Sequence, residues 1–116
     1  MNERLVATRK VAGALRPTEL TIEESIIKNA HLTITMVEAR QQARISLDIG
    51  QDALEQVLET NLHLAKARRS IGLAHAHLAT VRHDLHLPAR AAGDFETDCP
   101  NPGTQNTASP LRVVHG

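Results

Sequence analysis

The sequence predicts an all-α protein: a long antiparallel helical hairpin that dimerises into a four-helix bundle and carries a disordered C-terminal tail. Three observations support this fold class. A heptad row of small and apolar residues fills the second half of the hairpin, a second apolar face accompanies it, and the composition changes abruptly after Pro88. With one Phe and no Trp or Tyr in 116 residues, the chain also lacks the side chains that usually anchor a solitary globular core.

The heptad row runs from Ala53 to Leu85 at alternating steps of four and three residues. This is the spacing at which one helix packs along another. Small and large side chains alternate in the row, which favours close packing against a neighbouring helix. The predicted interface residues are Ala53, Val57, Leu64, Ala67, Ile71, Ala74, Leu78, Val81 and Leu85, with Thr60 completing the row.

A second apolar face lies on the same stretch, so a single neighbouring helix cannot cover both faces. The preceding helix is expected to cover one of them, and a second copy of the hairpin the other. The sequence therefore predicts a homodimer. The residues of the second face are Leu54, Leu58, Leu62, Ala65, Gly72, Ala76 and Ala79.

Before the first long helix, residues 1–17 form a basic N-terminal arm or a short helix that Pro17 is expected to end. Thr21 and Glu24 have the spacing of a capping box, which predicts a helix over residues 22–46. The expected inner face of this helix comprises Ile27, Ala30, Ile34, Val37, Gln41 and Ile45, with Ile26 and Thr33 at its flank.

A turn is expected near Gly50, where Asp48 can cap a new helix with Gln51 in the reciprocal position. The second helix should run over residues 49–87 and end at Pro88, which makes 18–88 the helical hairpin. A single unbroken rod is the alternative, because one Gly inside a helix costs only about 1 kcal/mol. A fold-back centred near Ile49 favours the hairpin, since it would bring Arg44 near Glu55 and Arg40 near Glu59.

Residues 89–116 are rich in Gly, Pro, Asn, Thr, Ser and Asp without periodicity, which predicts disorder. Thirteen basic and thirteen acidic residues cancel, so the chain has no overall field for nucleic acid or an anionic membrane. The sequence contains no leader and no long apolar run, and its single Cys99 excludes an internal disulfide. We therefore expect a cytoplasmic protein with no membrane contact.

Seven histidines raise the possibility of a metal or haem site, and five of them lie in the second predicted helix. Their helical positions separate them, and only His83 and His86 are close enough to share an ion. The sequence also has no nucleophile elbow and no Gly-rich phosphate loop. We therefore predict no catalytic residue, no cofactor and no metal. The five histidines are His63, His75, His77, His83 and His86.

Two stretches, Lys28-Asn29 and residues 69–78, resemble the dimerisation and phosphoacceptor hairpin of sensor histidine kinases with a His-Arg-x-Lys-Asn box. The second helix of that family often reads Arg-x-Ile-x-Leu-x-His-x-x-Leu. Ser25 stands where the family has its phosphoacceptor His, and no nucleotide-binding domain follows. The resemblance therefore implies a dimeric four-helix bundle that docks a partner, rather than a kinase. The residues that match the second pattern are Arg69, Ile71, Leu73, His75 and Leu78, and Ala53-Leu54-Glu55 falls at a similar distance from the Lys-Asn pair.

Three functions are therefore open on the sequence. The first is a non-enzymatic, self-associating helical interaction protein that binds a protein partner, for example as a signalling adaptor or regulator. The second is a degenerate phosphotransfer protein that uses His31 or His75. The third is a small nucleic-acid-associated protein that uses basic side chains, although no interleaved aromatic residues and no recognition helix accompany these basic residues. The basic residues of the N-terminal arm are Arg4, Arg9, Lys10 and Arg16, and Lys66, Arg68 and Arg69 form a second cluster.

Overall fold

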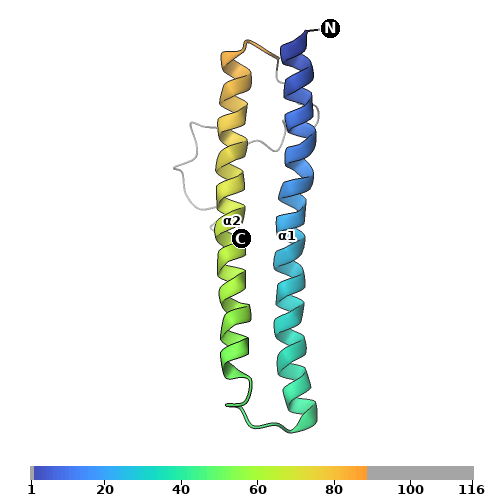
Figure 1. The fold of residues 1–116 in the computed structure, drawn as a ribbon, viewed down its shortest axis with the longest axis vertical. Helices are drawn as coiled ribbons and strands as arrows, with labels where there is room; N and C mark the ends of the chain where they lie inside the picture. The colour runs from blue at the N-terminus through green and yellow to red at the C-terminus, as the bar shows by residue number, and fades with distance from the viewer. Residues whose placement is uncertain (1, 89–116) are drawn as a thin grey trace, which may run out of the picture. The chain divides into compact units, whose positions relative to one another are not determined.

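The computed structural model describes residues 2–88, and these form two α-helices with no strand (Figure 1). Helix α1 spans Glu3–Ala43 and helix α2 spans Gln51–Asp84. The described residues confirm the all-α prediction. The predicted tail, 89–116, lies outside them.

Helix α1 continues through Pro17, so the predicted end of the N-terminal segment at this residue is wrong. A proline inside a helix removes one backbone hydrogen bond and costs about 3 kcal/mol. The covered side of the helix nevertheless continues from Leu15, which is buried, to the half-buried Ile22. Ending the helix at Pro17 would break this row. Thr21 is likewise an interior residue rather than a cap, and its carbonyl accepts a hydrogen bond from the Ser25 hydroxyl at 2.9 Å.

The C-terminal end of α1 is a Schellman motif built around Arg44, which has φ of 55°. The Ile45 N–H donates to the Arg40 carbonyl at 3.1 Å, and the Arg44 N–H donates to the Gln41 carbonyl at 3.2 Å. The Arg40 side chain adds a third bond, from Nη1 to the Ile45 carbonyl at 2.9 Å. These bonds satisfy backbone groups that a helix end leaves unpaired.

Helix α2 ends in the same motif, with His86 at φ of 58°. The Leu87 N–H donates to the Arg82 carbonyl at 3.2 Å, and the His86 N–H donates to the His83 carbonyl at 2.9 Å. Arg82 Nη1 then donates to the Leu87 carbonyl at 3.2 Å, as Arg40 does in α1. Both helices therefore end where an arginine four residues earlier can reach over the cap.

Between the helices, residues 44–50 are not helical, which excludes a single unbroken rod. Gly50 has φ of 82°, and its carbonyl accepts the first bond of α2, from the Leu54 N–H at 3.0 Å. The predicted cap by Asp48 is wrong, because its carboxylate accepts the Ser46 hydroxyl instead. This hydrogen bond, together with one from the Asp48 backbone, lowers the pKa of the Asp48 carboxyl. The Gln51 side chain donates to Glu55 at 3.0 Å.

The described residues divide into two units, 14–71 and 2–13 with 72–88. Within residues 14–71, α1 and α2 are antiparallel, and side-chain contacts join them. Asn29 Nδ2 donates to the Val57 carbonyl at 2.8 Å, and Arg68 contacts Glu23 Oε2 through Nη2 at 3.0 Å.

The predicted pairs Arg44–Glu55 and Arg40–Glu59 do not form. Arg40 donates to Ile45, and Glu59 lies 3.5 Å from His63. The prediction placed the fold-back near Ile49, whereas α1 already ends at Ala43, so Asn29 rather than a later residue faces Val57.

The covered side of α1 in residues 14–71 differs from the predicted inner face. Ile27, Ile34 and Val37 were expected inside, and they are 58%, 52% and 38% exposed. From Ile26 to Arg40, each covered position lies one residue before an expected one, as Ile26 precedes Ile27. The covered positions include polar side chains, which a prediction from the most apolar row leaves out. We name as the covered row Leu15, Glu19, Ile22, Ile26, Asn29, Thr33, Met36 and Arg40 of α1, and Leu54, Val57, Asn61, Leu64 and Ile71 of α2.

In the other unit, the described residues are 2–13 and 72–88. Ala12 of α1 is buried here, as are His75 and Ala76 of α2, which are 3% and 2% exposed. Two alanines and an imidazole therefore take the buried positions that large aliphatic side chains normally fill in a helical core.

Candidate functional site

Few apolar side chains of the described residues are completely covered. Only Ala12, Leu15 and Ala76 are buried apolar residues among residues 2–88, and none of their large side chains is fully buried. Fourteen large apolar side chains in the same range are exposed. A soluble monomer carries scattered exposed leucines without consequence, but a contiguous patch indicates a contact surface. The positions of these side chains therefore decide whether they are scattered or form a contact surface.

Six of the exposed side chains follow one rule in residues 14–71. Each comes directly after a residue of the covered row, as Ile27 follows Ile26 and Leu62 follows Asn61. We call this set the outer face. It comprises Leu20, Ile27, Ile34 and Val37 of α1, which are 44%, 58%, 52% and 38% exposed, and Leu58 and Leu62 of α2, which are 48% and 58% exposed.

The outer-face residues of the two helices lie on the same side of the pair. Both helices are right-handed and they run in opposite directions within residues 14–71. A step of one residue from the covered row therefore turns toward the same side on each helix. Ala65, which follows Leu64, is exposed on this side as well. The result is one apolar face to which both helices contribute.

Ile27 and Leu62 stand at about the same level of this face. Glu23 contacts Arg68, and Asn29 contacts Val57. Ile27 lies between Glu23 and Asn29 on α1, and Leu62 lies between Val57 and Arg68 on α2. Between Leu20 and Val37 of α1, Glu23 is the one acidic residue on this side of the helix. It forms an ion pair with Arg68 of α2 at 3.0 Å.

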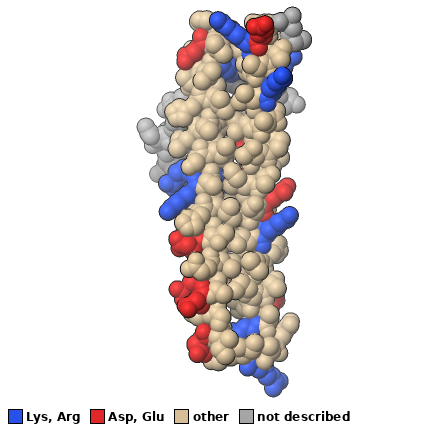
Figure 2. All heavy atoms as spheres, in the orientation of Figure 1, with Lys and Arg blue, Asp and Glu red and all other residues tan. Residues whose placement is uncertain are grey.

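The charges of α2 are ordered along the helix. Acidic Asp52, Glu55 and Glu59 precede Leu62, and basic Lys66, Arg68 and Arg69 follow it. Figure 2 shows acidic side chains gathered over the first part of α2 and basic ones beyond them. Glu55 follows Leu54 of the covered row, and Arg69 follows Arg68, which continues the spacing of that row and contacts Glu23 of α1. Glu55 and Arg69 therefore both lie on the outer side. This ordering is a property of the sequence that the heptad pattern does not reveal, because the pattern records apolar positions only.

An open groove of about 320 Å³ lies where the turn meets the helices of residues 14–71. Met36, Val37, Leu47 and Leu54 give it an apolar lining, and the only charged side chain in the lining is Arg40, which donates to the Ile45 carbonyl. Neither an acid–base pair nor a nucleophile lines the groove. Its chemistry is therefore that of an apolar contact surface.

The predicted interface row takes two kinds of position. Ala53, Leu78 and Val81 are exposed, the latter two at 36% and 50%. The others are half-buried at the edge of the covered row or within it. These half-buried residues are Val57, Leu64 and Ala67 and Ile71 in the unit 14–71, and Ala74 and Leu85 in the other unit.

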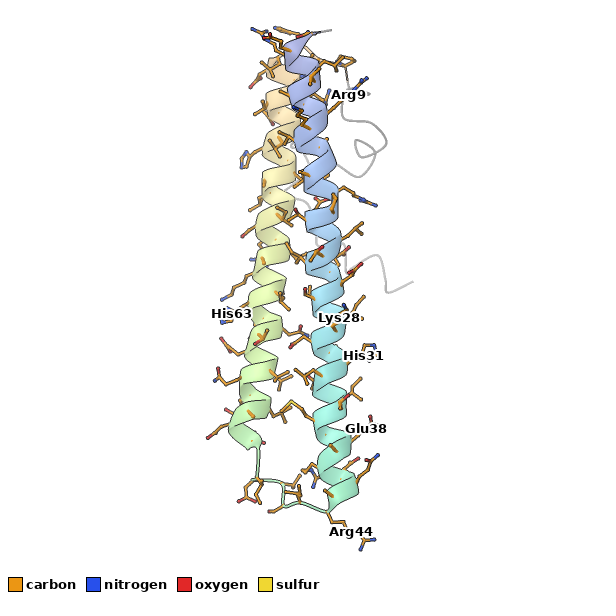
Figure 3. All side chains as sticks on the ribbon, turned by 45° about the vertical axis from the view of Figure 1, so that its right-hand side comes forward. Arg9, Lys28, His31, Glu38, Arg44 and His63 are labelled. Atoms are coloured by element: carbon orange, nitrogen blue, oxygen red, sulfur yellow. The ribbon has the colours of Figure 1, made fainter. Side chains whose placement is uncertain are left out.

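The two histidines considered for phosphotransfer have opposite surroundings. His31 is exposed and points away from α2 (Figure 3). His75 is 3% exposed and lies in the other unit. Asn29, which belongs to the kinase-like Lys-Asn pair, donates to the backbone of α2 rather than facing solvent. The basic residues Arg4, Arg9 and Lys10 are exposed on α1.

Residues 2–88 contain no group of three or more His, Cys, Asp or Glu side chains placed to hold a metal ion. Neither described helix has a stretch both long and apolar enough to cross a membrane.

The chain was compared with protein families, curated proteins and solved structures. No family matches it, and neither does any curated protein or solved structure.

Proposed function

We propose that this protein is a non-enzymatic, self-associating helical interaction protein that dimerises through the outer face. The observation that carries the proposal is the half-exposed apolar face formed by Leu20, Ile27, Ile34, Val37, Leu58 and Leu62. An aliphatic side chain gains about 1.5 to 3 kcal/mol on full burial, so each residue that is half exposed can gain about 1 kcal/mol more. A second copy doubles the number of residues that gain.

The thin interior supports the same proposal. Polar side chains take five of the thirteen covered positions, so a two-helix unit of this size has limited apolar burial of its own to offset chain entropy. Packing two such pairs face to face gives a four-helix bundle, in which the outer faces become the core. Self-association and stability are then coupled, because the same side chains supply both.

Measuring the mass of the full chain by light scattering over a range of micromolar concentrations tests the proposal. We expect a mass near twice 12.7 kDa that falls toward 12.7 kDa on dilution. A mass of 12.7 kDa throughout would overturn the proposal.

Two matched variants then locate the contact. Ile27→Glu should shift the dimer toward monomer, because it places a charge in the outer face. Leu32→Glu is the control, since Leu32 is 47% exposed on α1 but does not follow a residue of the covered row. Equal behaviour of the two variants would place the interface elsewhere.

A further inference from the structure

On the outer side of each helix, three positions are evenly spaced about a middle residue. On α1, Leu20 and Ile34 are each seven residues from Ile27. On α2, Glu55 and Arg69 are each seven residues from Leu62. Seven residues are two helical turns, or about 10 Å along the axis, so members of each pair lie on the same side of their helix. Ile27 and Leu62, the two centres, stand at about the same level.

The two helices are symmetric in different ways. If a second α1 lies antiparallel to the first with the two Ile27 residues opposite each other, Leu20 of each copy faces Ile34 of the other, so aliphatic side chains meet. If a second α2 lies antiparallel to the first with the two Leu62 residues opposite each other, Glu55 of each copy faces Arg69 of the other. The acidic part of each helix then faces the basic part of the other. Opposite charges thus meet at both ends of the α2 contact, while in-register parallel pairing of α2 would bring like charges together.

From this symmetry we infer that two copies of the chain pair antiparallel through their outer faces, about a two-fold axis that passes by Ile27 and Leu62. Each α1 lies against the α1 of the other copy, and each α2 against the other α2. Ile27 and Leu62 contact their own counterparts, Leu20 contacts Ile34, and Glu55 forms an ion pair with Arg69 twice. The two 44–50 turns lie at opposite ends of the contact. This inference rests on the proposed dimerisation and adds its geometry.

The residues that form the ion pairs are free to do so. Glu55 accepts one hydrogen bond, from Gln51 at 3.0 Å, which leaves the rest of its carboxylate open. Arg69 is exposed. Within one helix, Glu55 and Arg69 are fourteen residues and therefore about 21 Å apart, too far for a direct contact. Any energetic coupling between them must act between two chains.

Cysteine cross-linking in a Cys99→Ser background, with a short bismaleimide, tests the geometry. Leu62→Cys and Ile27→Cys should each cross-link to their own counterparts. Glu55→Cys alone should not, because its two copies lie about 21 Å apart across the axis. A mixture of Glu55→Cys and Arg69→Cys chains should cross-link. If instead Ile27→Cys cross-links only to Leu62→Cys, the chains pair with α1 against α2, and the inference is overturned.

Charge reversal provides a second readout that does not need a reagent. Glu55→Lys and Arg69→Glu should each weaken dimerisation about three- to tenfold at low salt, since each creates two like-charge contacts per dimer. The double variant should dimerise within about twofold of the original chain. An additive double variant would overturn the geometry while the dimer itself stands. A chain that is monomeric at every concentration would instead overturn the proposed function.

Discussion

Asn61 and Leu62 are neighbours in α2 that face in different directions, and they represent two surfaces of residues 14–71. Asn61 belongs to the covered row, is half-buried, and has an Oδ1 atom with no hydrogen-bond partner among the described residues. Leu62 belongs to the outer face and is 58% exposed. The covered row thus mixes apolar side chains with polar groups that gain little from burial, while the outer face consists of aliphatic side chains that are still exposed. The proposed association would therefore bury aliphatic side chains alone, whereas the chain's own helix pairing also buries polar ones.

The largest expected effect comes from making the outer face resemble the covered row. Leu62→Asn removes one aliphatic contact from each copy at the proposed two-fold axis, so its loss counts twice. At about 1 to 1.5 kcal/mol per side chain, the dissociation constant should rise on the order of 100-fold. Sedimentation equilibrium measures this change. Leu32→Asn is the control, and an equal effect at both positions would remove the distinction between the two surfaces.

The reverse change should stabilise the covered row. Asn61→Leu replaces an amide that leaves one oxygen unsatisfied, and the gain should be about 1 to 3 kcal/mol in the free energy of unfolding. Denaturation by urea, followed by circular dichroism at fixed chain concentration, measures it. Asn29→Leu is the contrasting variant, because it removes the hydrogen bond to the Val57 carbonyl and should not stabilise to the same extent. A loss of stability in Asn61→Leu would mean that the amide has a structural role.

Ala67→Leu separates the outer face from the predicted interface row. Ala67 is half-buried and lies in the predicted row but does not follow a covered position. If the outer face forms the contact, the dissociation constant should change by less than about threefold. If the row of small residues lies in a close interface, overpacking should cost about 1 to 3 kcal/mol. Light scattering on dilution distinguishes the two.

The smallest effect concerns the turn, which belongs to neither surface. The hydrogen bond from Ser46 lowers the pKa of the Asp48 carboxyl, so the folded state favours its ionised form. This contribution to stability is present above the unfolded pKa of about 3.9 and disappears as the pH falls through the lower folded value. In Ser46→Ala, the pKa of Asp48 should rise toward its ordinary value, as carboxyl-carbon NMR can show. Ser70→Ala, a substitution on α2, should leave it unchanged.

The sequence was sufficient to predict two helices and a break near Gly50, because heptad spacing and turn residues are local signals. It was not sufficient at Pro17, where the continuity of the covered row from Leu15 to Ile22 outweighs a local penalty. Nor could it orient α1. Choosing the most apolar row selected Ile27, Ile34 and Val37, whereas Ile26, Asn29 and Met36 face α2.

The reason for the wrong orientation is general. An apolar row predicts that one side of a helix is covered, but it does not predict whether the same chain or another copy covers it. The predicted second face of α2 is likewise divided, since Leu58 and Leu62 are exposed whereas Leu54 is half-buried and Ala76 is buried. The predicted interface row from Ala53 to Leu85 stays a prediction, as do the dimer and every functional role.

The two Schellman ends described above have a consequence for engineering. In each, an arginine, a residue at positive φ four positions later, and an aliphatic residue after it close the helix with bonds confined to six consecutive residues. A signal this local does not depend on a neighbouring helix. Residues 40–45 and 82–87 should therefore be transferable, and a designed helix of another length that carries either segment should terminate at the same place within it.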